Sequence, residues 1–268
     1  AASDVYKRQT QISTVHTFFN IATTVLLFPV SNWIIKLAKK IGGVKEDEAD
    51  RSKVLLDERM LETPSIALQS VINETIRMGE IVRESLNVAK NVLHTKSEED
   101  IKLLKEDEDI VDRLCAGITD YTIKLSALQI SEREHQTTAH LLQVLSDIER
   151  VSDYCENISE FAETMIEKKL DFSDVANEQL DEMIASTVDS YNYALDAFRE
   201  ESTEKALKVI EKETQVDDLE ITLRSRHMKR LAKNECNTEA GVVFLDTLVC
   251  MERISDHARN IAEEVLGN

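Results

Sequence analysis

The sequence predicts an all-α protein, with one N-terminal transmembrane helix followed by two tandem three-helix bundles. Three observations predict this fold. The 268 residues include only 6 Gly and 2 Pro, which leaves little room for the tight turns of a sheet. An uncharged apolar segment lies near the N-terminus. The rest of the chain has helical periodicity, and its second half repeats the first.

The first nine residues, AASDVYKRQ, do not fit the sequence after them. They are identical to the translation of a DNA sequence that resembles a transposon-end adapter used in preparing sequencing libraries, and a genuine polar loop is the alternative interpretation. We therefore expect residues 1–9 to be foreign to the natural protein, and the chain to be a fragment whose true N-terminal part is missing.

Residues 10–41 are predicted to form the last part of a membrane domain, with a transmembrane helix at about 17–38. No Asp, Glu, Lys or Arg occurs between Arg8 and Lys36. The apolar stretch at 17–35 is close to the roughly 20 residues that a helix needs to cross a bilayer. Several lysines follow directly, so the positive-inside rule predicts a plasma (inner) membrane protein whose residues after about 42 are cytoplasmic. A buried core helix is the alternative interpretation.

Three polar residues of this segment, His16, Asn20 and Thr24, are spaced four residues apart and share one stripe of the helix. A polar stripe facing lipid is unfavourable, so it should face other membrane helices. Interhelical hydrogen bonding and contact with an ion both remain open as its role.

Residues 42–63 are predicted to form a linker, since GGVKEDEADRSK is polar and Thr63-Pro64 is typical of a helix start. Ser97 and Ser131 each precede an acidic residue three places on, as in a capping box. Six helices are expected in two repeats, 64–168 and 174–266, of a domain spanning 64–268. Their predicted bounds are 64–94, 97–130, 132–168, 174–200, 203–233 and 237–266.

Charge and cysteine content narrow the function. The chain has 51 acidic and 32 basic residues, a formal net charge of −19, which repels nucleic acid and favours cations or basic partners. Its four cysteines form no Cys-x-x-Cys pair and fit buried thiols in a reducing cytosol. No Gly-x-Ser-x-Gly or P-loop motif occurs, so we expect no enzyme activity.

An acidic phrase is written twice. DIERVSDYCENISE, at 147–160, aligns at a spacing of 103 residues with CMERISDHARNIAE, at 250–263, and seven of the 14 positions are identical. Upstream, EDEDIVDRL at 106–114 aligns with EKETQVDDL at 211–219 at a spacing of 105. Two copies of one three-helix unit explain both spacings.

Each copy therefore contains the pattern Glu-x-x-x-Asp twice. Residues four apart project from one helix face, where two like charges repel unless a cation lies between them. Antiparallel packing of the second and third helices of a copy would bring four carboxylates together, as in oxygen-only sites for Mg²⁺, Mn²⁺, Ca²⁺ or iron. The predicted metal ligands are Glu108, Asp112, Glu149, Asp153, Glu213, Asp217, Glu252 and Asp256.

Asn157 and Asn260, one turn further along, are predicted to orient ligands or water around these carboxylates. The alternative is a solvated acidic face balanced by Arg150 and Arg253, since single Glu-x-x-x-Asp patterns arise by chance in so acidic a chain. Tyr154 and His257 occupy corresponding positions of the two copies, so the two sites need not bind equally.

These motifs resemble those of PhoU-type domains, which are two tandem three-helix bundles that regulate phosphate uptake. The resemblance covers about 64–266. VHTFFNIATTVLLFP at 15–29 and DERMLETPSIALQS at 57–70 are similar to the end of the membrane domain and the linker of bacterial sodium/phosphate cotransporters that carry such a domain. The resemblance implies sodium-coupled phosphate import, with a divalent metal or iron cluster bound by the eight carboxylates and the rest of the transporter as partner.

No Gln-Ser-Ser-Ser stretch of the transport motifs occurs here, so the chain is not expected to transport by itself. The sequence leaves open whether it forms a homodimer. Two rival functions are an acidic helical interaction module without metal and a ferritin-like di-metal enzyme. The enzyme class needs Glu-x-x-His on two helices, and only Glu132 with His135 fits that pattern.

Overall fold

A computed structural model describes Phe19 and residues 51–267 of the chain. Residues 52–267 belong to one compact unit. The predicted adapter residues 1–9, the predicted transmembrane helix and its stripe of His16, Asn20 and Thr24 lie outside the described residues, apart from Phe19. Among the described residues, no helix combines the length and apolar character needed to cross a membrane.

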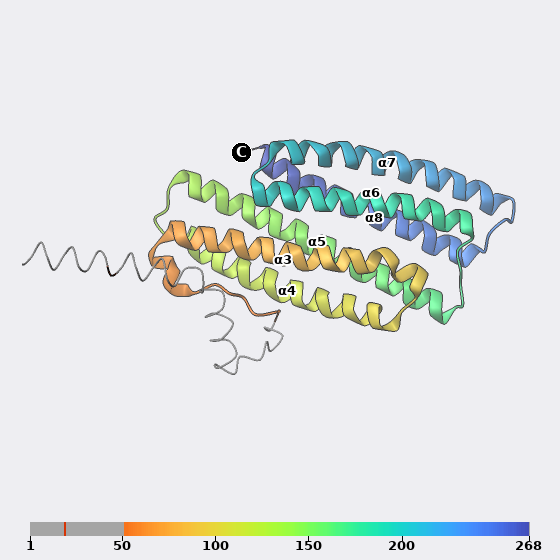
Figure 1. The fold of residues 1–268 in the computed structure, drawn as a ribbon, viewed down its shortest axis with the longest axis horizontal. Coiled ribbons are helices and arrows are strands. Elements are labelled where there is room, and N and C mark those ends of the chain that lie inside the picture. Colours follow the sequence, from red (N-terminus) through yellow and green to blue (C-terminus); the bar gives the residue numbers. More distant parts are fainter. Residues whose placement is uncertain (1–18, 20–50, 268) are drawn as a thin grey trace, which may run out of the picture. The chain divides into compact units, whose positions relative to one another are not determined.

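Six long α-helices form the described unit (Figure 1). The first three pack on one another as one bundle, and the last three as a second bundle. The all-α prediction with two three-helix units is thus confirmed for the described residues, and each helix ends within four residues of its predicted bound. The helices are α3 (Pro64–Thr95), α4 (Glu98–Ser126), α5 (Glu132–Glu167), α6 (Asp174–Glu200), α7 (Thr203–Ala232) and α8 (Thr238–Leu266).

Local capping explains where these helices begin. The side chain of Ser97 accepts a hydrogen bond from the Asp100 backbone N–H at the start of α4. At the start of α5, Ser131 and Glu134 form the full reciprocal capping box that the sequence predicts. Each cap satisfies N–H groups that have no partner within the helix, which stabilises the helix by about 1 kcal/mol.

The core lies between the three helices of each bundle. Apolar positions that recur at helical spacing in and just after the two acidic phrases face this core. Those that are buried are Ile148, Val151 and Ile158 on α5, and Met251, Ile254 and Ile261 on α8, whereas Phe161 is half-buried. Burying such a side chain stabilises the fold by about 1.5–3 kcal/mol. Because these residues are buried, the acidic residues between them are directed to the other faces of the helices.

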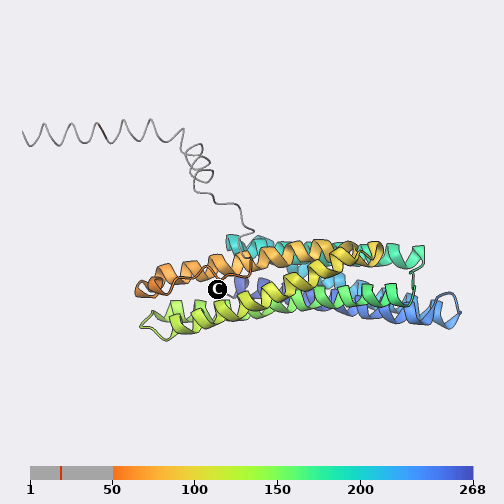
Figure 2. The ribbon, with the colours of Figure 1, turned by 90° about the horizontal axis from the view of Figure 1, so that it is seen from below.

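The two bundles meet where α5 packs on α8 and α3 packs on α6 (Figure 2). Gly79 on α3 permits the second contact, since a Cβ there would lie 2.5 Å from Leu195 Cδ1 on α6. The buried hydroxyl of Tyr191 donates a hydrogen bond to the Gly79 carbonyl at 3.0 Å. At the edge of this interface, Arg83 forms an ion pair with Asp196 at 2.7 Å.

The end of the predicted linker is folded against the first bundle. A short 3-10 helix, Glu58–Glu62, precedes α3. The Leu55 backbone N–H donates to Glu74 on α3 at 2.9 Å, and the Tyr121 hydroxyl on α4 donates to the Asp57 carbonyl at 3.0 Å. Apolar side chains of the segment also pack on the core, so this part of 42–63 differs from the solvated linker that its polar composition predicts.

All four cysteines are free, but the burial predicted for them is confirmed for only two. Cys155 and Cys250 are buried, whereas Cys115 and Cys236 are half-buried. Burial raises the pKa of Cys250 to about 12 and that of Cys155 still further, because desolvation disfavours the thiolate. These two thiols therefore behave as small core residues.

Candidate metal centres

The eight predicted carboxylates lie on two pairs of adjacent helices. Those of the first copy come from α4 and α5, and those of the second from α7 and α8. Within each pair the helices are consecutive and packed together. The four-residue spacing places successive acids one above the other on the face toward the neighbouring helix.

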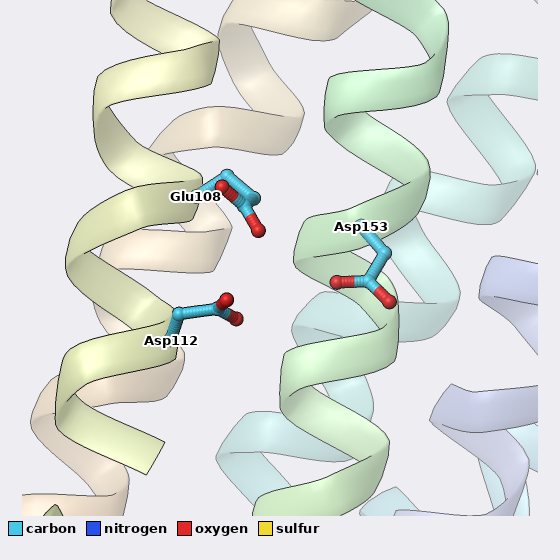
Figure 3. Close-up of side chains that lie close together, drawn as sticks. All are labelled: Glu108, Asp112 and Asp153. Carbon is cyan, nitrogen blue, oxygen red and sulfur yellow. The ribbon is translucent and has the colours of Figure 1, made fainter. Parts of the chain in front are cut away.

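Three carboxylates meet in the first copy, and we call Glu108, Asp112 and Asp153 the first cluster. Each offers one oxygen, and the three oxygens all lie within 4.8 Å of one another. In Figure 3, Glu108 and Asp112 extend from α4 toward Asp153 on α5. The fourth predicted ligand, Glu149, is not part of this triad, and its carboxylate lies 3.6 Å from the Arg150 guanidinium.

Burial makes ionisation of Glu108 and Asp153 in the first cluster less favourable than in water. The pKa of Glu108 is raised to about 7, mainly by desolvation and then by the negative charge of Asp112. Desolvation also raises the pKa of Glu149 and of Asp153. Near neutral pH without a cation, Glu108 is therefore only partly ionised.

The second copy has a matching triad of Glu213, Asp217 and Asp256, which we call the second cluster. Its three oxygens meet the same 4.8 Å limit. Glu252, like its counterpart in the first copy, lies outside the triad and pairs with a neighbouring arginine, Arg253, at 3.4 Å. Desolvation is the main cause that raises the pKa of Asp217.

Asp217 also carries an oxygen, Oδ1, that is buried and has no hydrogen-bond partner in the described part of the chain. A buried carboxylate oxygen without a partner is unfavourable by about 1–3 kcal/mol or more. A cation or an ordered water at this position would remove that penalty.

The donor set of both clusters fits a hard cation. Carboxylate oxygens bind Ca²⁺ at 2.3–2.6 Å, so two ligands on opposite sides of one ion are about 4.6–5.2 Å apart. Oxygens within 4.8 Å of one another are therefore spaced much like the ligands of one shared ion. Glu108, Asp112 and Asp153 would hold it in the first copy, with water completing the coordination.

The two asparagines predicted to support these sites have different surroundings. Asn157 is half-buried on α5. Asn260 donates its Nδ2–H to Asp147 Oδ1 at 3.0 Å, in the contact between the two bundles. Its amide therefore supports the contact between α5 and α8 and is not directed at a carboxylate of the second cluster.

Sequence reasoning missed the centre of this contact, Asp147, which is only 2 % exposed. His257 on α8 donates from Nδ1 to Asp147 Oδ1 at 2.8 Å, and Gln143 donates to the other oxygen at 3.1 Å. The ring of His257 also contacts that of Tyr154, with centroids 5.9 Å apart. An acid within an apolar stretch of α5 is the one sequence signal that could have indicated this role.

A second feature that was missed is Arg259, on α8. Its Nη1 donates to Glu213 of the second cluster at 2.7 Å, and its Nε donates to Glu263 at 2.8 Å. The two aligned acidic segments, 147–160 and 250–263, contain a signal of this arginine, because Arg259 aligns with the acidic Glu156. The ferritin-like pair Glu132 and His135 lies exposed at the start of α5, away from both clusters.

Comparison with known proteins supports the repeat. The family described as "PhoU domain" matches twice, at residues 75–162 and 180–265. "Phosphate-specific transport system accessory protein PhoU homolog 1" of Thermotoga maritima is 28% identical over 200 residues, which cover 72% of this chain and 83% of that protein. None of the relatives named here is described as an enzyme.

Longer relatives also match. "Putative inorganic phosphate export protein YjbB" of Salmonella typhimurium and of Escherichia coli is 23% identical over 257 residues, covering 94% of this chain. The chain spans about half of each, since the match covers 47% of their length.

Solved structures share the fold. The structure of PhoU from Pseudomonas aeruginosa has a TM-score of 0.70 at 22% identity, covering 74% of this chain and 95% of that one. The phosphate transport system regulatory protein PhoU from Streptococcus pneumoniae has a TM-score of 0.68 at 21% identity, covering 76% and 95%. Because the PhoU domain matches both halves of the repeat and more than half of the chain, the protein belongs to the PhoU domain family.

Proposed function

We propose that this chain contains the regulatory domain of a phosphate transporter, and that its two acidic clusters bind a divalent cation or iron. The observation that carries the metal part is the same in both copies. In each copy, three carboxylates from adjacent helices place their oxygens within 4.8 Å of one another, and desolvation followed by neighbouring negative charge raises the pKa of Glu108 in the first cluster and of Asp217 in the second.

The range of residues that the relatives match supports attachment of the helical domain to a transporter. The PhoU matches begin at residue 75, but the YjbB relatives match 94% of the chain and so include most of the region before α3. We infer that the natural protein joins a membrane domain to this domain and resides in the plasma membrane, with the helical bundles in the cytoplasm. Phosphate is the ion that the names of these relatives indicate.

Sodium coupling and import come from the resemblance of residues 15–29 and 57–70, whereas the name of the YjbB relatives describes export. Flux measurements on the full-length transporter would decide between the two directions. Phosphate is not expected to bind the clusters directly, because grouped carboxylates repel an anion unless a cation bridges them.

The structure suggests how a bound cation could act on the transporter. A cation held between Glu108, Asp112 and Asp153 would link α4 to α5. The same α4 contacts the segment that precedes α3, through the hydrogen bond from Tyr121 to the Asp57 carbonyl. A change in the position of α4 would therefore be passed to the segment that leads toward the N-terminal part of the chain.

Thermal unfolding with and without a chelator tests cation binding. A cation at about 100 times its dissociation constant stabilises the folded state by about 2.7 kcal/mol, which raises the melting temperature by roughly 5–10 °C. We expect Mn²⁺ to produce this shift in the wild type, and expect the shift to shrink in the double variant Glu108→Gln/Asp153→Asn.

The matched control is Asp120→Asn, which removes one exposed charge from the same helix α4, outside the cluster. It should leave the Mn²⁺ shift unchanged. If the wild type shows no shift with divalent cations or iron, and the double variant is simply more stable, the clusters do not bind metal. The chain would then be an acidic interaction module in which neutralisation only relieves repulsion.

A further inference from the structure

The repeat places opposite charges at one equivalent position. Glu156 in the first copy aligns with Arg259 in the second. Each lies three residues, about one helical turn, after the aspartate that its helix contributes to the cluster, Asp153 or Asp256. The two copies therefore differ by two units of charge at this position.

Arg259 is seated in the second cluster. Its guanidinium donates to Glu213 at 2.7 Å, and Glu213 is only 4% exposed. Glu263 holds the Nε side of the same guanidinium at 2.8 Å. The positive charge also favours the ionised form of Asp217 and so opposes the increase in its pKa. The guanidinium of Arg259 thus already forms an ion pair with Glu213 and partly offsets the negative charge around Asp217.

The first cluster has a negative charge at this place. Glu156 adds to the repulsion that raises the pKa of Glu108, and desolvation raises the pKa of Glu156 itself. The nearby Lys105 is bound by Glu163 at 2.7 Å. Both clusters also have an arginine beside them, since Arg150 and Arg253 each lie 3.2 Å from the aspartate of their own cluster. These two arginines therefore cause no difference in charge between the clusters.

We propose that Arg259 is the built-in counter-ion of the second cluster and makes the two halves of the repeat unequal. The first cluster takes up a dissolved cation. The second is satisfied by Arg259 and admits a cation only when the guanidinium is displaced from Glu213. The statement about the first cluster rests on the function proposed above, whereas the statement about Arg259 rests on its own contacts.

The physical reason is competition for the same oxygens. A cation entering the second cluster must break a charge-assisted hydrogen bond to a buried carboxylate and then bind beside a like charge. A cation entering the first cluster meets a neighbouring carboxylate instead. Coulomb energies at a few ångströms make this difference large even with the high effective dielectric of a protein surface.

Calorimetric titration of the chelator-treated full chain with Mn²⁺ tests the proposal. The wild type should bind Mn²⁺ mainly at the first cluster, and Glu108→Gln should remove that binding. Arg259→Gln should strengthen binding at the second cluster by about tenfold or more. The exchange variant Glu156→Arg/Arg259→Glu should move the tighter binding from the first cluster to the second.

Lys208→Gln is the matched control, because it removes the same charge from an exposed pair with Glu204 on α7. It should leave Mn²⁺ binding unchanged. Melting curves give a second readout: without metal, Arg259→Gln should lower the melting temperature, since buried Glu213 loses its partner, and Mn²⁺ should restore it. A purely structural Arg259 would give the loss without the restoration.

Two results would overturn the proposal. One is wild-type protein in which both clusters bind Mn²⁺ equally tightly. The other is an Arg259→Gln protein that neither gains binding nor regains stability with Mn²⁺. Absence of binding at the first cluster of the wild type would instead count against the proposed function. A gain of binding in Arg259→Gln would still support the role of Arg259 in that case.

Discussion

The contact between the two bundles depends on one buried acid, and its removal should be the most damaging polar substitution in the interface. Asp147 on α5 is 2 % exposed and accepts hydrogen bonds from His257, Asn260 and Gln143 at 2.8, 3.0 and 3.1 Å. Since an ionised carboxylate only accepts, His257 must donate from Nδ1. Two of the three donors come from the other bundle.

The magnitude follows from these contacts. Hydrogen bonds to a charged group contribute about 1.5–3 kcal/mol each, and removing one partner of a buried pair costs about 3–5 kcal/mol. The His257 side chain is 20% exposed, so water can replace part of what it loses. We therefore expect Asp147→Ala to lower the free energy of unfolding by about 3 kcal/mol, near the lower limit of that range.

A loss of about 3 kcal/mol corresponds to roughly 6–12 °C in melting temperature for a domain of this size. Urea and thermal unfolding followed by circular dichroism would measure it. Asp189→Ala is the control, since Asp189 is an exposed acid whose pair with Lys212 spans 3.4 Å, and it should change stability by less than about 0.5 kcal/mol.

Comparing the double variant Asp147→Ala/His257→Ala with the two single variants measures the interaction free energy between the two side chains. If the pair is coupled, its loss should be smaller than the sum of the two single losses by about 1 kcal/mol or more. The reasoning is refuted if Asp147→Ala destabilises the protein no more than Asp189→Ala does.

Three further predictions concern other parts of the molecule. With chelator present, the raised pKa of Glu108 should make stability decrease as pH rises from about 4.5 toward 7, because the folded protein binds the proton more tightly than the unfolded chain. Melting curves recorded against pH would measure this decrease, and Glu108→Gln should remove it. An unchanged slope in the variant would contradict the assignment. Gly79→Leu should destabilise the interface by about 1–3 kcal/mol or more, since even a Cβ at this position would lie 2.5 Å from Leu195. Urea unfolding would measure the loss. A neutral result would show that α3 and α6 can separate without loss of stability. In thiol labelling of the native chain, Cys236 should react rapidly and Cys155 only on unfolding, because Cys155 is buried and its thiolate is strongly disfavoured; equal rates would contradict the described packing.

Much of the fold could be predicted because its signals are local. Helical periodicity, the paucity of Gly and Pro, and serine caps such as Ser97 and Ser131 located the six helices to within a few residues. The repeat then indicated that the same unit occurs twice. Such patterns depend on residues three or four apart, which a single turn of helix brings together.

The candidate site could be predicted only in part. Glu-x-x-x-Asp spacing identified acids on one face of each helix, and the structure brings Glu108, Asp112 and Asp153 together, with a matching triad in the second copy. It leaves Glu149 and Glu252 beside their neighbouring arginines. Which of four acids converge depends on the rotation and offset of two packed helices, and spacing along one helix does not specify either.

What the sequence by itself determined was a helical protein with a duplicated acidic motif, because helix formation and repetition are written in near neighbours and in direct alignment. What only the tertiary structure decided was which charges meet. Arg259 reaches Glu213 across 46 residues of chain, and His257 reaches Asp147 across 110. Contacts of that range depend on how helices pack side by side, so spacing along the chain does not specify that Arg259 meets Glu213 or that His257 meets Asp147.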